Sequence, residues 1–150
     1  MNSWRRRTAS VTRKRTGGST VRNRNELLVG VHREDERGNV YTLRDPEGLN
    51  LFWNGKEISV PYGFECDGAS VPRFFWRYVF PPGDTQAMRA AFCHDWIYRT
   101  HPSGWTKAEA DRMFRDFLLE DGVAPRRARR AYWGVKLFGG SSWRQGGLVK

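Results

Sequence analysis

The stretch Ala87-Met-Arg-Ala-Ala-Phe-Cys-His-Asp-Trp-Ile-Tyr98 decides the fold of the helical part of this chain. Its apolar residues run almost without a break, so we expect a largely buried helix. His94 and Asp95 stand side by side within it. Burying a titratable pair is costly unless partners compensate the lost hydration. The pair therefore needs either a structural partner or a chemical task.

The side of this expected helix that carries His94 is made of small residues. On a helical wheel, Phe92 and Trp96 lie opposite His94. Such a face leaves room for the close approach of another helix or for a pocket above the imidazole. The neighbours of His94 on its own side are Ala87, Ala90, Ala91 and Tyr98.

Two more helices are expected downstream. Thr106-Lys-Ala-Glu109 is a capping box that opens a strongly amphipathic segment. Pro125 opens a last helix, which ends at Gly139-Gly140 with arginines on its outer face. If the first of these packs antiparallel to the helix of His94, Asp111 could reach the imidazole. The core stripes are Ala110, Met113, Phe114, Phe117 and Leu118 in the first helix, and Ala128, Ala131, Tyr132, Val135 and Phe138 in the second.

The part of the chain before these helices is typical of β-structure. Asn54-Gly55 is a two-residue hairpin signal between two β-type segments. A short aromatic helix is then expected from Ser70 to Phe80, before Asp84 caps the helix of His94. The predicted fold class is α+β, with a small antiparallel sheet of three or four strands followed by about four helices. The β-type segments are Leu27 to His32, Val40 to Leu43, Leu49 to Trp53 and Glu57 to Val60.

Charge divides the chain, whose net charge is +10, into three blocks. Residues 1–25 carry eight Arg or Lys and no acid, residues 26–121 carry eleven against sixteen acids, and residues 122–150 carry seven against none. We expect residues 1–25 to form a flexible basic arm and residues 26–150 a single domain. The arm is a candidate for nonspecific contact with nucleic acid or acidic lipid. Its candidate contact residues are Arg5, Arg6, Arg7, Arg13, Lys14 and Arg15.

Cysteine content and hydropathy indicate the compartment. Cys66 and Cys93 are too few for a disulfide scaffold and suggest no zinc site. The N-terminal arginines are not followed by the apolar core of a signal peptide, and no apolar run is long enough for a transmembrane segment. We therefore expect a reduced, cytosolic environment.

Four segments resemble an uncharacterised family, a domain of unknown function common in tailed phages and prophages. The resemblance implies a phage protein located in the host cytoplasm or the virion, with phage structural proteins as partners. The segments that carry it are Asp67-Gly-Ala-Ser-Val-Pro72, His94-Asp-Trp-Ile-Tyr98, Ala110-Asp-Arg-Met-Phe114 and Tyr132-Trp133 through Gly140.

The spacing of His94, Asp95 and Tyr98 also resembles the His-Asp-x-x-Tyr helix of secreted and parvoviral phospholipases A2. Asp111 is similar to the acid on the second helix of that family. By this resemblance His94 would activate water, while Asp111 and Tyr98 would hold its ring. Asp95, with Asp67 as a second acid, would ligate Ca²⁺ or another divalent cation.

Four interpretations remain open from the sequence, one of them a small accessory protein that binds a host factor through the aromatic helix. The first is a hydrolase that acts on a lipid or another ester, with His94 as base. The second is a non-catalytic virion or assembly protein whose basic arm contacts DNA or another phage protein. In the third, His94 and Asp95 form a buried structural network. There, Asp111 or a loop carbonyl would bind His94, and an arginine would pair with Asp95, the candidates being Arg73, Arg77 and Arg99.

Overall fold

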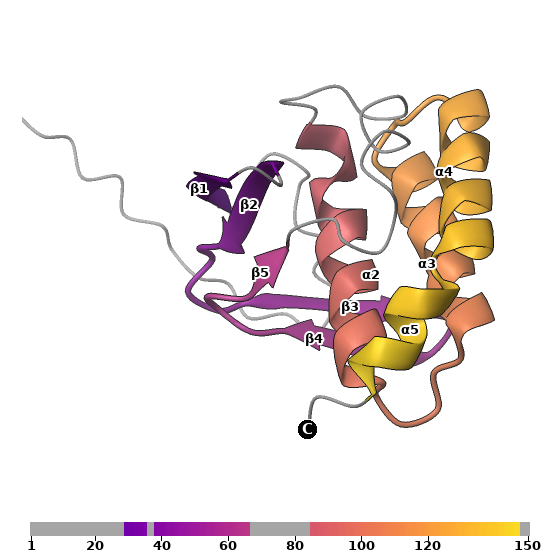
Figure 1. Ribbon diagram of the computed structural model, residues 1–150, viewed down its shortest axis with the longest axis horizontal. Coiled ribbons are helices and arrows are strands. Elements are labelled where there is room, and N and C mark those ends of the chain that lie inside the picture. Colours follow the sequence, from indigo (N-terminus) through magenta and orange to yellow (C-terminus); the bar gives the residue numbers. More distant parts are fainter. Residues whose placement is uncertain (1–28, 36–37, 67–84, 148–150) are drawn as a thin grey trace, which may run out of the picture.

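A computed structural model describes residues 29–35, 38–66 and 85–147. In this part of the chain five short strands precede four helices, so the predicted α+β class is confirmed. The strands gather on one side of α2, and α3 and α4 lie on the other (Figure 1). The strands are β1 (Val29–Asp35), β2 (Gly38–Leu43), β3 (Leu49–Trp53), β4 (Lys56–Val60) and β5 (Glu65–Cys66), and the helices are α2 (Met88–Thr100), α3 (Lys107–Glu120), α4 (Pro125–Phe138) and α5 (Gly140–Gly146).

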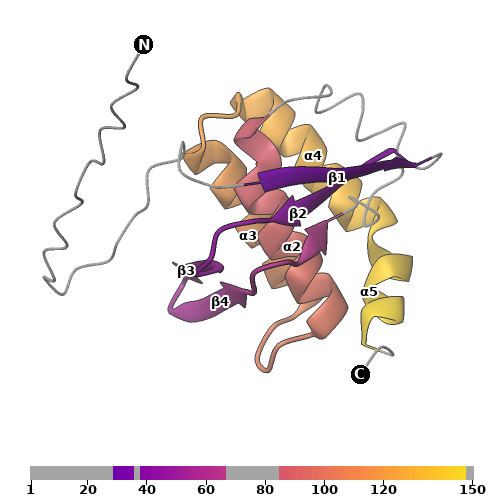
Figure 2. The ribbon, with the colours of Figure 1, turned by 90° about the vertical axis from the view of Figure 1, so that its left-hand side faces the viewer.

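The strands form two small antiparallel sheets, where the sequence predicted one. One sheet has the order β1-β2-β5, and the other is the β3-β4 hairpin. The cause is β5, which pairs Cys66 with Tyr41 and so occupies the edge of β2 that β3 would otherwise extend. Figure 2 shows both sheets in front of α2.

The predicted hairpin turn between β3 and β4 is confirmed. Asn54 and Gly55 both have positive φ angles, 47° and 76°, as a type I′ turn requires. The register pairs Trp53 with Lys56 and Leu49 with Val60. This register turns Trp53, Ile58 and Val60 into the core.

The helices begin where their local signals place them, with one exception. Thr106 and Glu109 form the complete capping box of α3, and Pro125 opens α4. The helix α2 instead follows a 3-10 turn, Thr85–Ala87, and has no side-chain cap. The expected cap Asp84 and the aromatic helix from Ser70 to Phe80 lie outside the described residues.

The core is continuous from the sheets to α4 and runs through α2. Phe64 packs edge-on against Trp96 from the strand side, at 5.2 Å between ring centroids. The predicted stripe of α3 is fully buried, whereas in α4 Phe138 is exposed and Tyr132 half-buried. No helix in the described ranges is long and apolar enough to cross a membrane.

The short helix α5, which the sequence did not predict, packs backbone to backbone against the end of α2. A Cβ on Gly146 would lie 1.8 Å from the carbonyl oxygen of Tyr98, so this contact requires glycine. Trp143 of α5 stacks on His101 at 3.9 Å and meets Tyr98 edge-on. The C-terminal end of α2 is therefore covered by α5.

Candidate active site

The helices α2 and α3 run antiparallel and bring His94 against Asp111. Nε2 of His94 lies 3.1 Å from Oδ1 of Asp111. The connection between the helices is short, and the capping box at Thr106 fixes where α3 begins. The prediction that Asp111 would reach His94 across this helix pair agrees with the geometry. Asp111 is 2% exposed, so its carboxylate is buried between the helices.

The carboxylate of Asp111 is held by three side chains. Tyr98 donates its hydroxyl to Oδ1 at 2.5 Å, the same oxygen that faces His94. Lys107 donates to Oδ2 at 2.7 Å. Burial alone would raise the pKa of Asp111, but the hydrogen bonds and charge of these partners outweigh it and lower the pKa. Asp111 is thus an ionised carboxylate with both oxygens engaged.

Lys107 is a member of this cluster that the sequence interpretation missed. Its ammonium group also donates to the backbone carbonyls of Val135 and Lys136, at 3.1 and 3.3 Å. These carbonyls belong to the last turn of α4, where the helix dipole attracts a cation. The signal in the sequence is the spacing of Lys107 and Asp111, four residues apart on one helix. We call Lys107, Asp111, His94 and Tyr98 the His94 network.

The imidazole of His94 is enclosed, with 3% of its surface exposed. Its ring lies against those of Tyr98 and Phe114, at centroid distances of 4.1 and 4.9 Å. Because Nε2 faces a carboxylate, the network assigns the proton of the neutral ring to Nε2. Nδ1 is then an acceptor, and it makes no hydrogen bond to any residue that the structure describes.

Tyr98 is fixed from the opposite side by the junction of α4 and α5. A Cβ on Gly139 would lie 2.6 Å from the Tyr98 hydroxyl, so a larger residue there would displace it. Burial, followed by the charge of Asp111, raises the pKa of Tyr98 well above its usual range. The phenol therefore stays protonated and remains a hydrogen-bond donor to Asp111.

Asp95 lies beside His94 in sequence but binds elsewhere. Its Oδ2 is 2.9 Å from Nη2 of Arg99, one of the arginines expected as a structural partner. In residues 29–35, 38–66 and 85–147, no three His, Cys, Asp or Glu side chains come together as a metal-binding group. Asp67, predicted as the second metal ligand, lies outside these ranges, and so does the basic arm.

A second charged cluster, also missed by the sequence interpretation, joins the other ends of the same helices. Arg89 of α2 binds Asp121 and Glu120 at the end of α3, at distances of 2.9 to 3.0 Å. Burial would lower the pKa of Arg89, but the two acids raise it. We call Arg89, Glu120 and Asp121 the Arg89 network.

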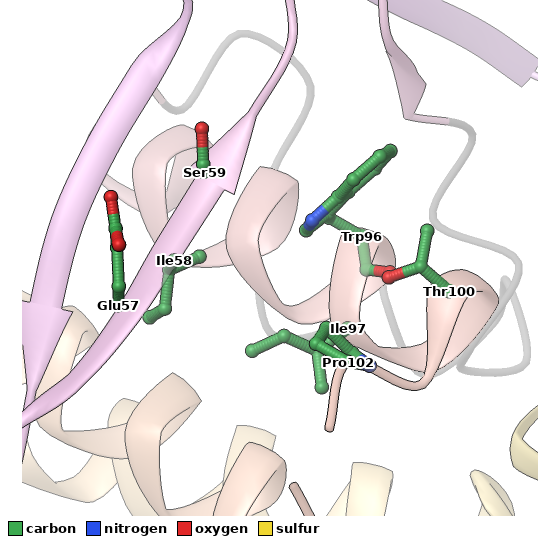
Figure 3. Close-up of a pocket in the computed structure, with 7 residues that line it drawn as sticks. All are labelled: Glu57, Ile58, Ser59, Trp96, Ile97, Thr100 and Pro102. Atoms are coloured by element: carbon green, nitrogen blue, oxygen red, sulfur yellow. The ribbon is translucent and has the colours of Figure 1, made fainter. Parts of the chain in front are cut away.

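The structure also contains a cavity of about 310 Å³ between β4 and the C-terminal half of α2 (Figure 3). Ile58, Trp96, Ile97 and Pro102 make most of its wall apolar. Neither His94 nor Asp111 lines it. The cavity is therefore separate from the His94 network.

The fold and the site together define an α+β protein with a buried His-Asp-Tyr-Lys cluster on a helical hairpin. By comparison with known families, the chain belongs to the family described as "Protein of unknown function (DUF1353)", whose model matches residues 50–135. The match spans the region from β3 to most of α4, and thus every member of the His94 network.

Two proteins of Sinorhizobium fredii are similar to the chain. "Uncharacterized protein y4jT" is 30% identical over 99 residues, which is 66% of this chain and 27% of that protein. "Uncharacterized protein y4iH" is 34% identical over 75 residues, 50% of this chain and 30% of that protein. The chain therefore matches less than a third of the length of each relative. No solved structure is significantly similar to it.

Proposed function

We propose that the chain is a hydrolase of phage or prophage origin, acting on a lipid or another ester in the host cytoplasm or the virion. One observation carries the proposal. Nε2 of His94 faces an ionised Asp111 that Tyr98 and Lys107 hold in place, while Nδ1 has no partner among the described residues. This is the arrangement of a general base whose tautomer is fixed by a carboxylate.

In the proposed reaction, Nδ1 of His94 takes a proton from a water molecule as the water oxygen adds to the ester carbonyl. Asp111 stabilises the imidazolium that forms. The ring then returns the proton to the leaving oxygen as the carbon–oxygen bond breaks, which yields a carboxylic acid and an alcohol. Tyr98 and Lys107 do not touch the reacting atoms and act by positioning Asp111.

The resemblance to phospholipase A2 supports these roles, because it implies that His94 activates water and that Asp111 orients the ring.

The proposal assigns no step to a metal ion. The guanidinium of Arg99 beside Asp95 opposes a second cation at that carboxylate, so the described residues do not fit a calcium site. The predicted ligand pair of Asp95 and Asp67 stays a proposal, which is tested by comparing hydrolysis with and without a chelator.

The test is the substitution His94→Gln, which keeps an amide donor for Asp111 but removes the base. We expect kcat/KM on phospholipid vesicles or a soluble aryl ester to fall about 10²- to 10⁴-fold. His101→Gln is the matched control, since it makes the same change just after the same helix, and it should leave kcat/KM nearly unchanged. Circular dichroism of each variant checks the fold. Full activity of folded His94→Gln protein would overturn the proposal.

A second candidate function rests on the charge of residues 1–25, which carry eight basic residues and no acid. We propose it as an alternative: a virion or assembly protein whose arm contacts DNA or another phage protein. Deleting residues 1–25 should then abolish the salt-dependent binding of a DNA duplex. Unchanged DNA binding after the deletion would rule this alternative out.

A further inference from the structure

The solvent-facing side of α4 combines basic and large apolar side chains. Figure 1 shows α4 at the edge of the helical layer farthest from the strands. Trp133 is 47% exposed and Leu137 67% exposed, although both are residues that proteins usually bury. We define the α4 outer face as Arg126, Arg129, Trp133, Lys136 and Leu137, all of which are exposed.

These residues form one continuous stripe. They recur at intervals of three and four residues, so they project from a single side of the helix. The opposite side carries Ala128, Ala131 and Val135, which are buried against α3 and the rest of the core. Trp133 and Leu137 therefore lie outside the buried core of the described residues.

The charged residues of α4 and of the segment that follows it have one sign. Residues 122–150 contain seven Arg or Lys and no acid. Lys136 lies 4.7 Å from the centroid of the Trp133 ring, so a cation and an aromatic ring share the same patch. A surface of this composition complements a partner that is both anionic and apolar.

We infer that the α4 outer face docks the protein on an anionic lipid bilayer. The guanidinium groups of Arg126 and Arg129 would contact headgroup phosphates, and Trp133 and Leu137 would enter the interface between headgroups and acyl chains. Nucleic acid offers the phosphates but no apolar layer for an aliphatic side chain such as Leu137. A bilayer satisfies both halves of the face.

The docking face is joined directly to the His94 network. Lys107 binds Asp111 through one contact and the carbonyls of Val135 and Lys136 through two others. The same turn of α4 therefore anchors the network and displays Leu137. This inference rests on the proposed function where it names a lipid surface as the source of the ester substrate, but docking itself requires no catalysis.

The test measures binding of the full chain, carrying His94→Gln to prevent hydrolysis, to sedimented vesicles. Vesicles of phosphatidylcholine mixed with phosphatidylglycerol are compared with vesicles of phosphatidylcholine alone. The double variants are Arg126→Glu with Arg129→Glu, and Trp133→Ser with Leu137→Ser. Their matched controls are Arg112→Glu with Arg144→Glu, and Phe52→Ser with Tyr62→Ser, which change exposed residues of the same types on other elements.

We expect the anionic vesicles to bind the parent chain and each outer-face double variant to bind at least about tenfold more weakly, with both control pairs close to the parent. Equal loss in outer-face and control variants would mean that general charge or hydrophobicity drives binding, and would overturn the inference. So would a loss of duplex DNA binding in the arginine pair while vesicle binding persists. Protein with His94 intact that docks on the vesicles but hydrolyses neither phospholipid nor the aryl ester would refute the hydrolase proposal alone.

Discussion

The two ends of the α2–α3 pair are joined by two charged networks of different kinds. In the Arg89 network one cation lies between two carboxylates, and Glu120 keeps 58% of its side chain exposed. In the His94 network one carboxylate is shared by a histidine, a tyrosine and a lysine, and both Asp111 and His94 are almost fully buried. The same two helices thus carry an ion pair at one end and an enclosed imidazole at the other.

This difference suggests that the Arg89 network serves stability and the His94 network serves catalysis. The Arg89 network consists of one guanidinium bound to two carboxylates and contains no imidazole, so it can tie the helices together but has no group suited to proton transfer. The His94 network contains a group suited to proton transfer and a carboxylate that fixes its orientation. Substitutions at the two ends should therefore affect different measurements.

The largest effect is expected from Asp111→Ala. Removing this carboxylate leaves Lys107, His94 and Tyr98 without their shared acceptor, and breaking a buried network in this way costs about 3–5 kcal/mol. Urea unfolding of the variant should show that loss, whereas Arg112→Ala on the exposed face of the same helix should change stability by less than about 0.5 kcal/mol. If Asp111→Ala lowers the free energy of unfolding no more than Arg112→Ala does, then Asp111 does not hold the His94 network together.

A smaller effect, confined to stability, is expected from Arg89→Met. Met keeps much of the packing that the guanidinium makes on the ring of Phe117, but it removes the hydrogen bonds of the guanidinium to Asp121 and Glu120. We expect a loss of about 2–3 kcal/mol in the free energy of unfolding, the range for hydrogen bonds to charged groups. At a temperature where the variant is folded, kcat/KM should match that of the parent. If kcat/KM fell as well, the Arg89 network would affect activity and not stability alone.

The pairing of α2 with α3 was predictable from the sequence because the signals of α3 are local. The capping box from Thr106 to Glu109 fixes the start of α3, and the spacing of its apolar residues sets the buried face. Those two facts, together with the short connection to α2, were enough to place Asp111 near His94. The hairpin at Asn54-Gly55 was predictable for the same reason.

The parts that were missed depend on contacts between distant residues. The strand β5 is two residues long and exists because Cys66 meets Tyr41. The helix α5 contains few apolar residues and is held by Trp143 and by the close approach of Gly146 to α2. For Lys107 the sequence indicates only the pairing with Asp111 four residues later, because its partners on α4 are backbone carbonyls, which leave no side-chain pattern.

The smallest predicted effect uses Cys93, which lies beside the Arg89 network, as a pH probe of that end. Burial raises the pKa of the Cys93 thiol from 9.0 to about 12, with Arg89 lowering it and Asp121 raising it by smaller amounts. A thiol whose pKa is higher in the folded state contributes stability that is fully present below pH 9 and is lost as the pH rises towards 12.

Cys93→Ala removes this contribution, so its stability should fall less steeply than that of the parent above pH 9. Between pH 7 and pH 10 the parent should lose about 1 kcal/mol more of its free energy of unfolding than Cys93→Ala does, as measured by urea unfolding at both pH values. Because Arg89 lowers this pKa, Arg89→Met should extend the alkaline loss to higher pH without changing its size at pH 10. Asp111→Asn, at the other end of the pair, should leave the Cys93-dependent difference unchanged. A changed Cys93-dependent difference in Asp111→Asn would show that the two networks are electrostatically coupled rather than separate.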